Sequence, residues 1–185
     1  MRFLALSGSL RAGASNTAIL EAAKLVAAPD VEVELYAGLG DLPAFNPDLD
    51  TGEATQLPRP AADLRDRIGR ADALLISTPE YAHGIPGSLK NALDWLVGSL
   101  EFPGKPVGLL GVAGRAAFAR AQLVEVLHTM SAQVVDEACV SIDLPRRDVD
   151  ARAIAADPDA SDALRTAIVA LATSTAQEAP ADRAG

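Results

Sequence analysis

Two hydrophobic patterns alternate along the chain, short continuous apolar runs and longer segments with apolar residues three or four positions apart. Continuous runs are typical of strands buried on both faces, and the wider spacing predicts helices. The predicted strands are residues 3–6, 31–35, 71–77 and 107–112, with a fifth in two pieces, 134–135 and 138–142. The predicted helices are residues 18–27, 61–70, 88–98, 118–130 and 163–172.

The order of these elements predicts a parallel α/β sheet with helices on both faces, because strands and helices alternate. Residues 31–35 alternate valine and leucine with glutamate, which favours a half-exposed strand near an edge. Residues 38–60 read as a long loop, and residues 146–159 as a charged, irregular segment. We expect one domain over residues 1–175 and a flexible tail over 176–185.

The loop after the first strand has the composition of an anion-binding loop. Small residues, Ser7-Gly8-Ser9, lead to a helix whose partly positive N-terminus points at the same spot. Arg11 adds a planar fork of donors, which suits phosphate. Hydroxyls come from Ser9, Ser15 and Thr17, and Asn16 is the expected N-cap.

Two common phosphate motifs do not fit this loop. A Walker A loop ends in Gly-Lys-Ser/Thr, and a dinucleotide loop needs G-x-G-x-x-G, but Gly8 is followed by Ser9 and Leu10. Two interpretations of the loop are left. It binds the phosphate of a mononucleotide, or it is an ordinary strand-to-helix turn with a polar cap.

Composition narrows the class of protein. The 185 residues are 49% hydrophobic but only 4% aromatic, and the net charge of −9 argues against non-specific binding to nucleic acid or to an anionic membrane. Cys139 is the single cysteine, so no disulfide within the chain and no cysteine cluster is expected. The first apolar run is too short for a signal peptide, and no run is long enough to span a membrane, so we expect a cytoplasmic protein.

Two further loops follow the third and fourth strands, residues 78–87 and 113–116. Parallel strands end at the same edge of a sheet, so these loops and the first one should meet there, where such sheets bind ligands. Five parallel strands with a phosphate loop after the first fit the flavodoxin-like order 2-1-3-4-5, a doubly wound fold in which FMN binds at this edge.

Two stretches, SGSLRAGASNTAIL and STPEYAHGIPGSLKNALDWL, resemble the two signatures of the NADPH-dependent FMN reductase family, which includes flavin, quinone, chromate and azo reductases. The resemblance runs from residue 3 to about residue 142. It implies FMN, NADPH or NADH, and a small-molecule electron acceptor. It also implies a homodimer or tetramer, with the helix over residues 89–96 packed against a second subunit.

The resemblance also implies three groups of cofactor-binding residues. Those for the FMN phosphate are Ser9, Arg11, Asn16 and Thr17; those for the isoalloxazine ring are Pro79, Glu80, Tyr81, Ala82, His83 and Gly84; and those for the loop on its far side are Ala113, Gly114 and Arg115.

The chain departs from the family's usual residues at several of these places. The family's serine three residues after the loop arginine is Ala14 here, so either Ser15 substitutes or one hydrogen bond is lost. Ala82 stands where asparagine is common, and Gly84 where serine is common. The third loop has fewer glycines than usual, and together these changes bear on affinity and on the choice of substrate.

Several side chains have a structural alternative. Glu80 is expected either to cap the next helix, over residues 88–98, or to bond a backbone amide, and the resemblance implies that its carboxylate frames the loop. Arg115 is expected either to bind the flavin or a nicotinamide phosphate or to lie in solvent. His83 is expected near the flavin ring, and a direct contact with the ring is left open. His128 is interpreted as an ordinary helix residue. Trp95 reads as a packing or interface residue and Cys139 as a small core residue.

The function predicted is an FMN-dependent NAD(P)H oxidoreductase that passes electrons to a flavin, a quinone or a similar acceptor. No catalytic dyad and no metal site is predicted, because hydride transfer is the chemistry of the flavin itself. Tyr81 is the only aromatic residue of the three loops, which leaves a ring face open and favours an enzyme over an electron carrier. The alternative is a non-catalytic flavin-binding or regulatory protein of the same fold. A phosphate-ester binding protein or hydrolase of the same fold is a third interpretation, but the sequence lacks the acidic metal-binding cluster expected for it.

Overall fold

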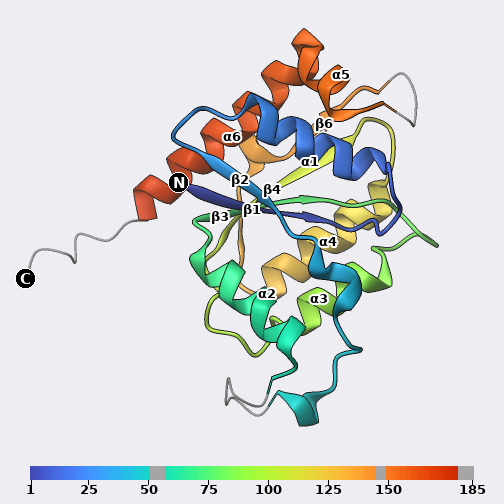
Figure 1. Ribbon diagram of the computed structural model, residues 1–185, viewed down its shortest axis with the longest axis vertical. Coiled ribbons are helices and arrows are strands. Elements are labelled where there is room, and N and C mark those ends of the chain that lie inside the picture. Colours follow the sequence, from blue (N-terminus) through green and yellow to red (C-terminus); the bar gives the residue numbers. More distant parts are fainter. Residues whose placement is uncertain (51–56, 145–148, 179–185) are drawn as a thin grey trace, which may run out of the picture.

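A computed structural model describes residues 1–50, 57–144 and 149–178. Its centre is a parallel sheet with the order β2-β1-β3-β4-β5, and β6 also pairs with β4 (Figure 1). The strands are β1 Arg2–Ser7, β2 Glu32–Leu35, β3 Ala73–Ser77, β4 Pro106–Val112, β5 Gln133–Val134 and β6 Val140–Ile142. This confirms the flavodoxin-like order, with β2 at one edge.

The fifth strand position is divided, as predicted. β5 and β6 both run parallel to β4, and the short 3-10 turn η4, Asp136–Ala138, lies between them. The turn packs directly on β4, because a side chain at Gly108 would come within 2.9 Å of the Ala138 carbonyl oxygen. Gly108 therefore allows the close approach that interrupts the strand.

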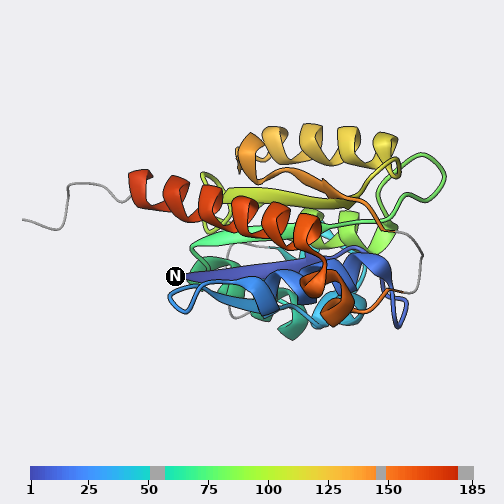
Figure 2. The same ribbon diagram turned by 90° about the horizontal axis from the view of Figure 1, so that it is seen from above.

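Six helices in the described residues form two layers around the sheet (Figure 2). α1 Ser15–Val26, α5 Ala151–Ala156 and α6 Pro158–Glu178 share one hydrophobic core with one face. α2 Arg59–Arg70, α3 Gly87–Asp94 and α4 Ala117–Thr129 share a second core with the other face. Alternate residues of each central strand point into opposite cores, as with Leu75 and Leu74 of β3.

The segment after β2 contains two 3-10 turns, η1 Gly38–Asp41 and η2 Pro47–Leu49. It reaches across to α3, where the Trp95 indole N–H donates to the Pro43 carbonyl at 2.8 Å. Trp95 is fully buried, which confirms its packing role within the chain. The rest of the predicted loop includes residues 51–56, which lie outside the described residues.

The predicted helix over residues 88–98 is shorter in the structure, since α3 ends at Asp94. The Trp95 carbonyl accepts two hydrogen bonds from the Arg65 guanidinium, at 2.8 and 2.7 Å. Residues 96 and 97 bond to carbonyls only three positions back, so the chain leaves the helix as a tight turn.

The prediction of an irregular segment over residues 146–159 was wrong where the structure describes it. Asp150 caps α5 by accepting from the Ala153 N–H at 2.8 Å. Asp157 accepts from the Ala160 N–H at 2.9 Å, and Pro158 begins α6. These aspartates act as helix caps. Residues 145–148 lie outside the described residues.

The C-terminal helix is longer than the predicted range of 163–172. It continues to Glu178, so the first three residues of the predicted tail, 176–178, are helical. The remaining residues, 179–185, lie outside the described residues.

Candidate functional site

The loops after β1, β3 and β4 border one cavity of about 440 Å³ at the carboxyl edge of the sheet. This volume lies within the range of small-molecule and cofactor sites. The lining residues are Ser9, Arg11, Ala14, Ser15, Asn16, Thr78, Pro79, Glu80, Tyr81, Val112, Arg115 and Ala116. The structure therefore brings together eight of the fourteen predicted site residues: Ser9, Arg11, Ser15, Asn16, Pro79, Glu80, Tyr81 and Arg115.

The first loop leaves the sheet against the end of β3. The Gly8 N–H donates to the Ser77 carbonyl at 2.8 Å, which continues the sheet by one step. A side chain at Gly8 would come within 2.4 Å of the Thr78 hydroxyl oxygen. Gly8 thus lets the loops after β1 and β3 approach each other and share one cavity.

The start of α1 differs from the prediction that Asn16 is the N-cap. Ala14 occupies the N-cap position and has no side chain that could cap the helix. Asn16 lies inside the first turn, where its Oδ1 accepts a 3.0 Å hydrogen bond from the Ser77 hydroxyl. The helix N-terminus is therefore turned to the cavity without a side-chain cap from Ala14.

Thr17 does not line this cavity. Its hydroxyl oxygen lies 2.8 Å from that of Ser7. Both residues border a neighbouring cavity of about 320 Å³ between the first loop and the end of β2, and Ser9 and Arg11 border both cavities. Successive residues of a helix point about 100° apart, so Asn16 and Thr17 face different cavities. The direction of each side chain can be predicted from the sequence only when the first residue of the helix is known.

The loop after β3 forms a tight hairpin. Tyr81 and Gly84 exchange two backbone hydrogen bonds of 3.0 Å, and the two residues between them have positive φ, +51° at Ala82 and +59° at His83. This is the conformation of a type I′ turn, which asparagine and glycine favour. Ala82, His83 and Gly84 form the tip of the hairpin and are not among the residues that line the cavity.

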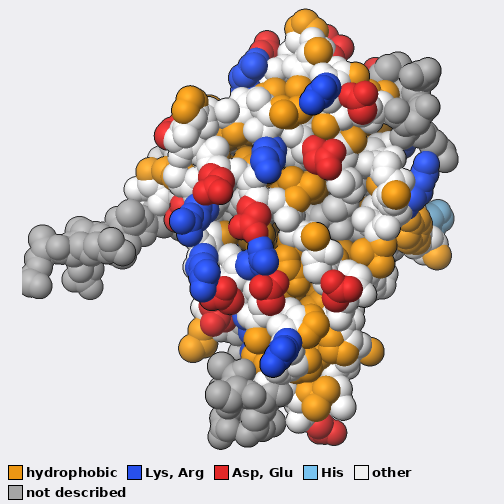
Figure 3. Space-filling view, in the orientation of Figure 1, with side chains coloured by type: hydrophobic (Ala, Val, Ile, Leu, Met, Phe, Trp, Pro, Cys, Tyr) orange, Lys and Arg blue, Asp and Glu red, His pale blue; other side chains and the backbone are white. Residues whose placement is uncertain are grey.

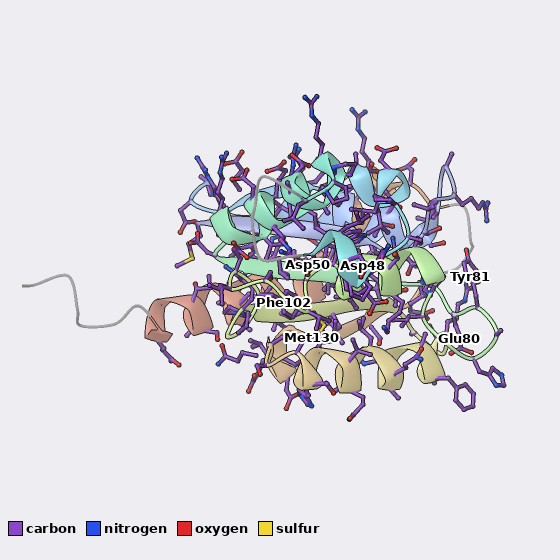
Figure 4. All side chains as sticks on the ribbon, turned by 90° about the horizontal axis from the view of Figure 1, so that it is seen from below. Asp48, Asp50, Glu80, Tyr81, Phe102 and Met130 are labelled. Atoms are coloured by element: carbon purple, nitrogen blue, oxygen red, sulfur yellow. The ribbon has the colours of Figure 1, made fainter. Side chains whose placement is uncertain are left out.

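Three contacts join this loop to the start of α4. The Glu80 carboxylate accepts from the N–H groups of Phe118 and Ala119, at 2.9 and 3.1 Å. The His83 ring stacks on that of Phe118, and the Gln122 side-chain oxygen accepts from the Ile85 N–H at 2.7 Å. Figure 4 shows Glu80 beside the first turn of α4, with Tyr81 on the same loop.

Glu80 therefore bonds backbone amides and caps a helix, but the helix is α4 and not the next one along the chain, α3, as predicted. Ala116 at the N-cap of α4 is left-handed, with φ +59°, and makes no side-chain cap. The carboxylate from another loop supplies the acceptor and the negative charge that a helix N-terminus favours.

The third loop contributes Arg115, Ala116 and Val112 to the cavity, whereas Ala113 and Gly114 are exposed and do not line it. The sequence prediction missed Ala14, Thr78, Val112 and Ala116, which directly flank the predicted residues. It also missed Gln122 of α4, whose side chain bonds the loop after β3. No sequence motif marks this residue, and only its position on the helix relative to the loop could have indicated the contact.

The donor set at one end of the cavity fits a phosphate. The start of α1 supplies backbone N–H groups, Ser9 and Ser15 supply hydroxyls, and Arg11 supplies a cation. Within the described residues, the Arg11 side chain has no ion pair or hydrogen bond. A phosphate monoester is a good match for these groups.

Other reactive groups lie elsewhere. Burial raises the pKa of the Cys139 thiol, which keeps it protonated at neutral pH, as expected of a packed residue. His128 is exposed on α4. In the described part of the chain, no group of three or more His, Cys, Asp or Glu side chains could hold a metal ion, and no helix is long and apolar enough to cross a membrane.

Comparison with known proteins gives a consistent result. The profile of the family described as NADPH-dependent FMN reductase matches residues 1–145. An NAD(P)H-dependent FMN reductase of Pseudomonas aeruginosa is 42% identical over 66% of this chain, and the alignment spans 65% of that protein. A quinone reductase of Escherichia coli is 32% identical over 74% of each chain.

A solved structure covers nearly the whole chain. It is that of FerB from Paracoccus denitrificans, a flavoenzyme NAD(P)H:(acceptor) oxidoreductase. The two chains are 28% identical and superpose with a TM-score of 0.74, over 95% of this chain and 97% of FerB.

Proposed function

The chain belongs to the NADPH-dependent FMN reductase family, and on that premise we propose that it is an FMN-dependent NAD(P)H oxidoreductase that reduces a flavin, a quinone or a similar small acceptor. One observation carries the proposal, the open cavity with an anion-binding end described above. Bound FMN would supply the redox chemistry, by taking up hydride from NAD(P)H and delivering electrons to the acceptor.

The residues of the chain have binding and orienting roles in this proposal. Arg11, Ser9 and Ser15, with the amides at the start of α1, would hold the phosphate, and Asn16 would act from the position fixed by Ser77. Pro79, Glu80, Tyr81 and Arg115 would border the ring. Thr17, Ala82, His83, Gly84, Ala113 and Gly114 do not line the cavity, so we assign them no direct contact with FMN.

The fixed loop geometry supports an orienting role. Glu80 and Gln122 tie the loop after β3 to α4, so the cavity wall on that side is held by hydrogen bonds before any ligand arrives. A prearranged wall lowers the ordering cost of binding a rigid ring. Tyr81 lines the cavity but is exposed, so it would leave space beside the flavin ring for the nicotinamide or the acceptor.

The test is a titration of the purified protein with FMN, followed by flavin fluorescence, and then NAD(P)H oxidation with a panel of acceptors. We expect micromolar or tighter binding of FMN and NAD(P)H consumption that depends on an acceptor. FMN binding without turnover with any flavin or quinone would instead favour the non-catalytic alternative. Absence of FMN binding would contradict both.

We propose further that the protein is a homodimer or tetramer that acts in the cytoplasm. Leu89, Ala92 and Leu93 are buried within the chain, so a contact made by the helix over residues 89–96 would use its other face or the residues just after it. Val97 and Leu100, just after α3, are 65% and 93% exposed and support a contact there. Light scattering on the wild type and on Leu100→Glu tests it, and a monomeric wild type would contradict it.

A further inference from the structure

A small recess opens from the main cavity beneath the start of α4. The two spaces share Thr78, Val112, Arg115 and Ala116. The recess has a volume of about 30 Å³, enough for a few heavy atoms and too small for a ring. Its lining also includes Arg120 of α4 and Ser141 of β6, which neither the family resemblance nor the proposed function uses.

Arg120 is held in place without being neutralised. One terminal nitrogen donates to the Cys139 carbonyl at 3.2 Å, and the other donates to the Ser141 hydroxyl at 3.4 Å. Both acceptors are uncharged. A guanidinium has five N–H donors, so three remain after these two bonds.

Most of the arginines outside the cavity are arranged differently. Arg2, Arg65, Arg67, Arg70 and Arg165 each lie within ion-pair distance of a carboxylate. Figure 3 shows such acidic and basic side chains next to one another across one face. Within the described residues, Arg11, Arg115 and Arg120 form no ion pair, and all three border the cavity or its recess. Arg59 and Arg152, which are exposed, also lack an ion pair with a described carboxylate, so what distinguishes the three is their position at one cavity.

This contrast is informative because the chain has a net charge of −9. Cations left without a carboxylate partner in an acidic protein concentrate positive potential at one place. Glu80 is the acidic residue that lines the main cavity, and its carboxylate already accepts two α4 amides. The described lining of the recess contains no Asp or Glu.

We propose that Arg115 and Arg120 form an oxyanion subsite for the second ligand of the oxidoreductase, separate from the phosphate end of the cavity that contains Arg11. This inference rests on the proposed function. The ligand group is an ionised oxygen, either a phosphate of the nicotinamide nucleotide or the ionised oxygen of an acceptor such as a hydroxyquinone. Guanidinium groups bind such oxygens through charge-assisted hydrogen bonds, and both of these arginines line the same recess.

The test compares Arg120→Gln and Arg120→Lys with the wild type, each saturated with FMN after its FMN affinity has been measured. Lys24→Gln is the control, because Lys24 is exposed on α1 and its loss changes the net charge equally. The KM values are measured for NADPH, for 2-hydroxy-1,4-benzoquinone and for neutral 1,4-benzoquinone.

We expect Arg120→Gln to raise one KM by about tenfold or more, the effect of losing a hydrogen bond to a charged group. If the KM for ionised 2-hydroxy-1,4-benzoquinone rises and the KM for neutral 1,4-benzoquinone does not, the oxyanion belongs to the acceptor. A rise in the KM for NADPH identifies the nucleotide. Arg120→Lys should recover part of the loss, and Lys24→Gln should behave as the wild type.

A second measurement does not depend on turnover. Calorimetric titration of inorganic pyrophosphate into the FMN-saturated protein should show binding that Arg120→Gln weakens about tenfold. If the wild type does not bind FMN, the proposed function is wrong. The pyrophosphate titration of the apo protein then still tests whether the recess binds an oxyanion. Unchanged pyrophosphate affinity and unchanged KM values in Arg120→Gln, with its thermal midpoint retained, would overturn the subsite.

Discussion

The imidazole ring of His83 stacks on the phenyl ring of Phe118, with 4.3 Å between the ring centroids and 19° between the planes. His83 belongs to the hairpin tip after β3, and Phe118 to the first turn of α4. With the hydrogen bonds of Glu80 and Gln122, the stack joins two elements that both border the cavity. The left-handed residues at the tip are thus held from the adjacent helix, which is how a strained backbone persists.

Replacement of Ala82 by glycine should stabilise the protein. Ala82 has φ +51°, a conformation that costs an L-residue about 1–2 kcal/mol, which exceeds the roughly 0.5–1 kcal/mol that glycine costs in conformational freedom. We expect Ala82→Gly to raise the free energy of unfolding by about 0.5–1 kcal/mol, measured by urea denaturation. Ala121→Gly is the matched control, because Ala121 is exposed in the middle of α4 and should lose about 1 kcal/mol. A loss at both positions would contradict the strain.

Removal of the Glu80 charge should destabilise the start of α4. Its carboxylate is the acceptor for the Phe118 and Ala119 amides, and Ala116 offers no side-chain cap. We expect Glu80→Gln to lower the free energy of unfolding by about 1–2 kcal/mol, the usual effect of a cap and a helix-terminal charge. Glu125→Gln, on the exposed face of the same helix, should change it by less than about 0.5 kcal/mol. Equal effects of the two substitutions would refute the cap.

The sequence was enough to predict the sheet and the site's location. The continuous apolar runs of β1, β3 and β4 are buried on both faces, and the alternating run of β2 lies at the edge. The three loops at the carboxyl ends of β1, β3 and β4 do meet, because parallel strands leave no other arrangement.

The finer placement of side chains could not be predicted, for physical reasons. Asn16 is not the N-cap and Thr17 does not line the main cavity because α1 starts at Ser15, and one residue changes the direction of a helical side chain. His83 turns to Phe118 because the hairpin tip is left-handed, a backbone state that neither Ala82 nor His83 favours. Contacts between distant segments decide both.

The ion pair of Arg65 and Asp50 is a third such contact and should be important for stability. Their side chains are only 10% and 9% exposed, with 2.7 Å between nitrogen and oxygen, and Arg65 also donates to the Trp95 carbonyl. Arg65→Met leaves a buried carboxylate and should cost about 3–5 kcal/mol. The double variant Arg65→Met, Asp50→Leu should recover much of this loss in urea denaturation. A loss in the double variant equal to the sum of the single losses would show that the pair does not interact.

Stability at alkaline pH should depend on Tyr36. Burial, together with the nearby Asp63 carboxylate, raises the pKa of the Tyr36 phenol to about 12. Between pH 10 and 12 the unfolded chain loses this proton while the native chain keeps it, so the stability that Tyr36 contributes is present below pH 10 and is lost as pH rises through 12. Tyr36→Phe should reduce the alkaline loss of unfolding free energy by about 2 kcal/mol. Parallel pH profiles for the two proteins would contradict this assignment.

Arg11 provides the sharpest test of the phosphate end of the cavity. Its guanidinium has no ion pair or hydrogen bond among the described residues, so its removal should leave no unpaired carboxylate and little change in stability. We expect Arg11→Ala to weaken FMN binding by about 1.5–3 kcal/mol, which is about 10- to 150-fold, with thermal unfolding of the apo protein unchanged. Arg11→Lys should lose less, because a point charge remains, and Lys24→Ala should lose nothing. Riboflavin, which lacks the phosphate, should bind the wild type and Arg11→Ala equally. An equal loss of riboflavin affinity would mean that Arg11 acts on the ring or on the fold, and not on the phosphate.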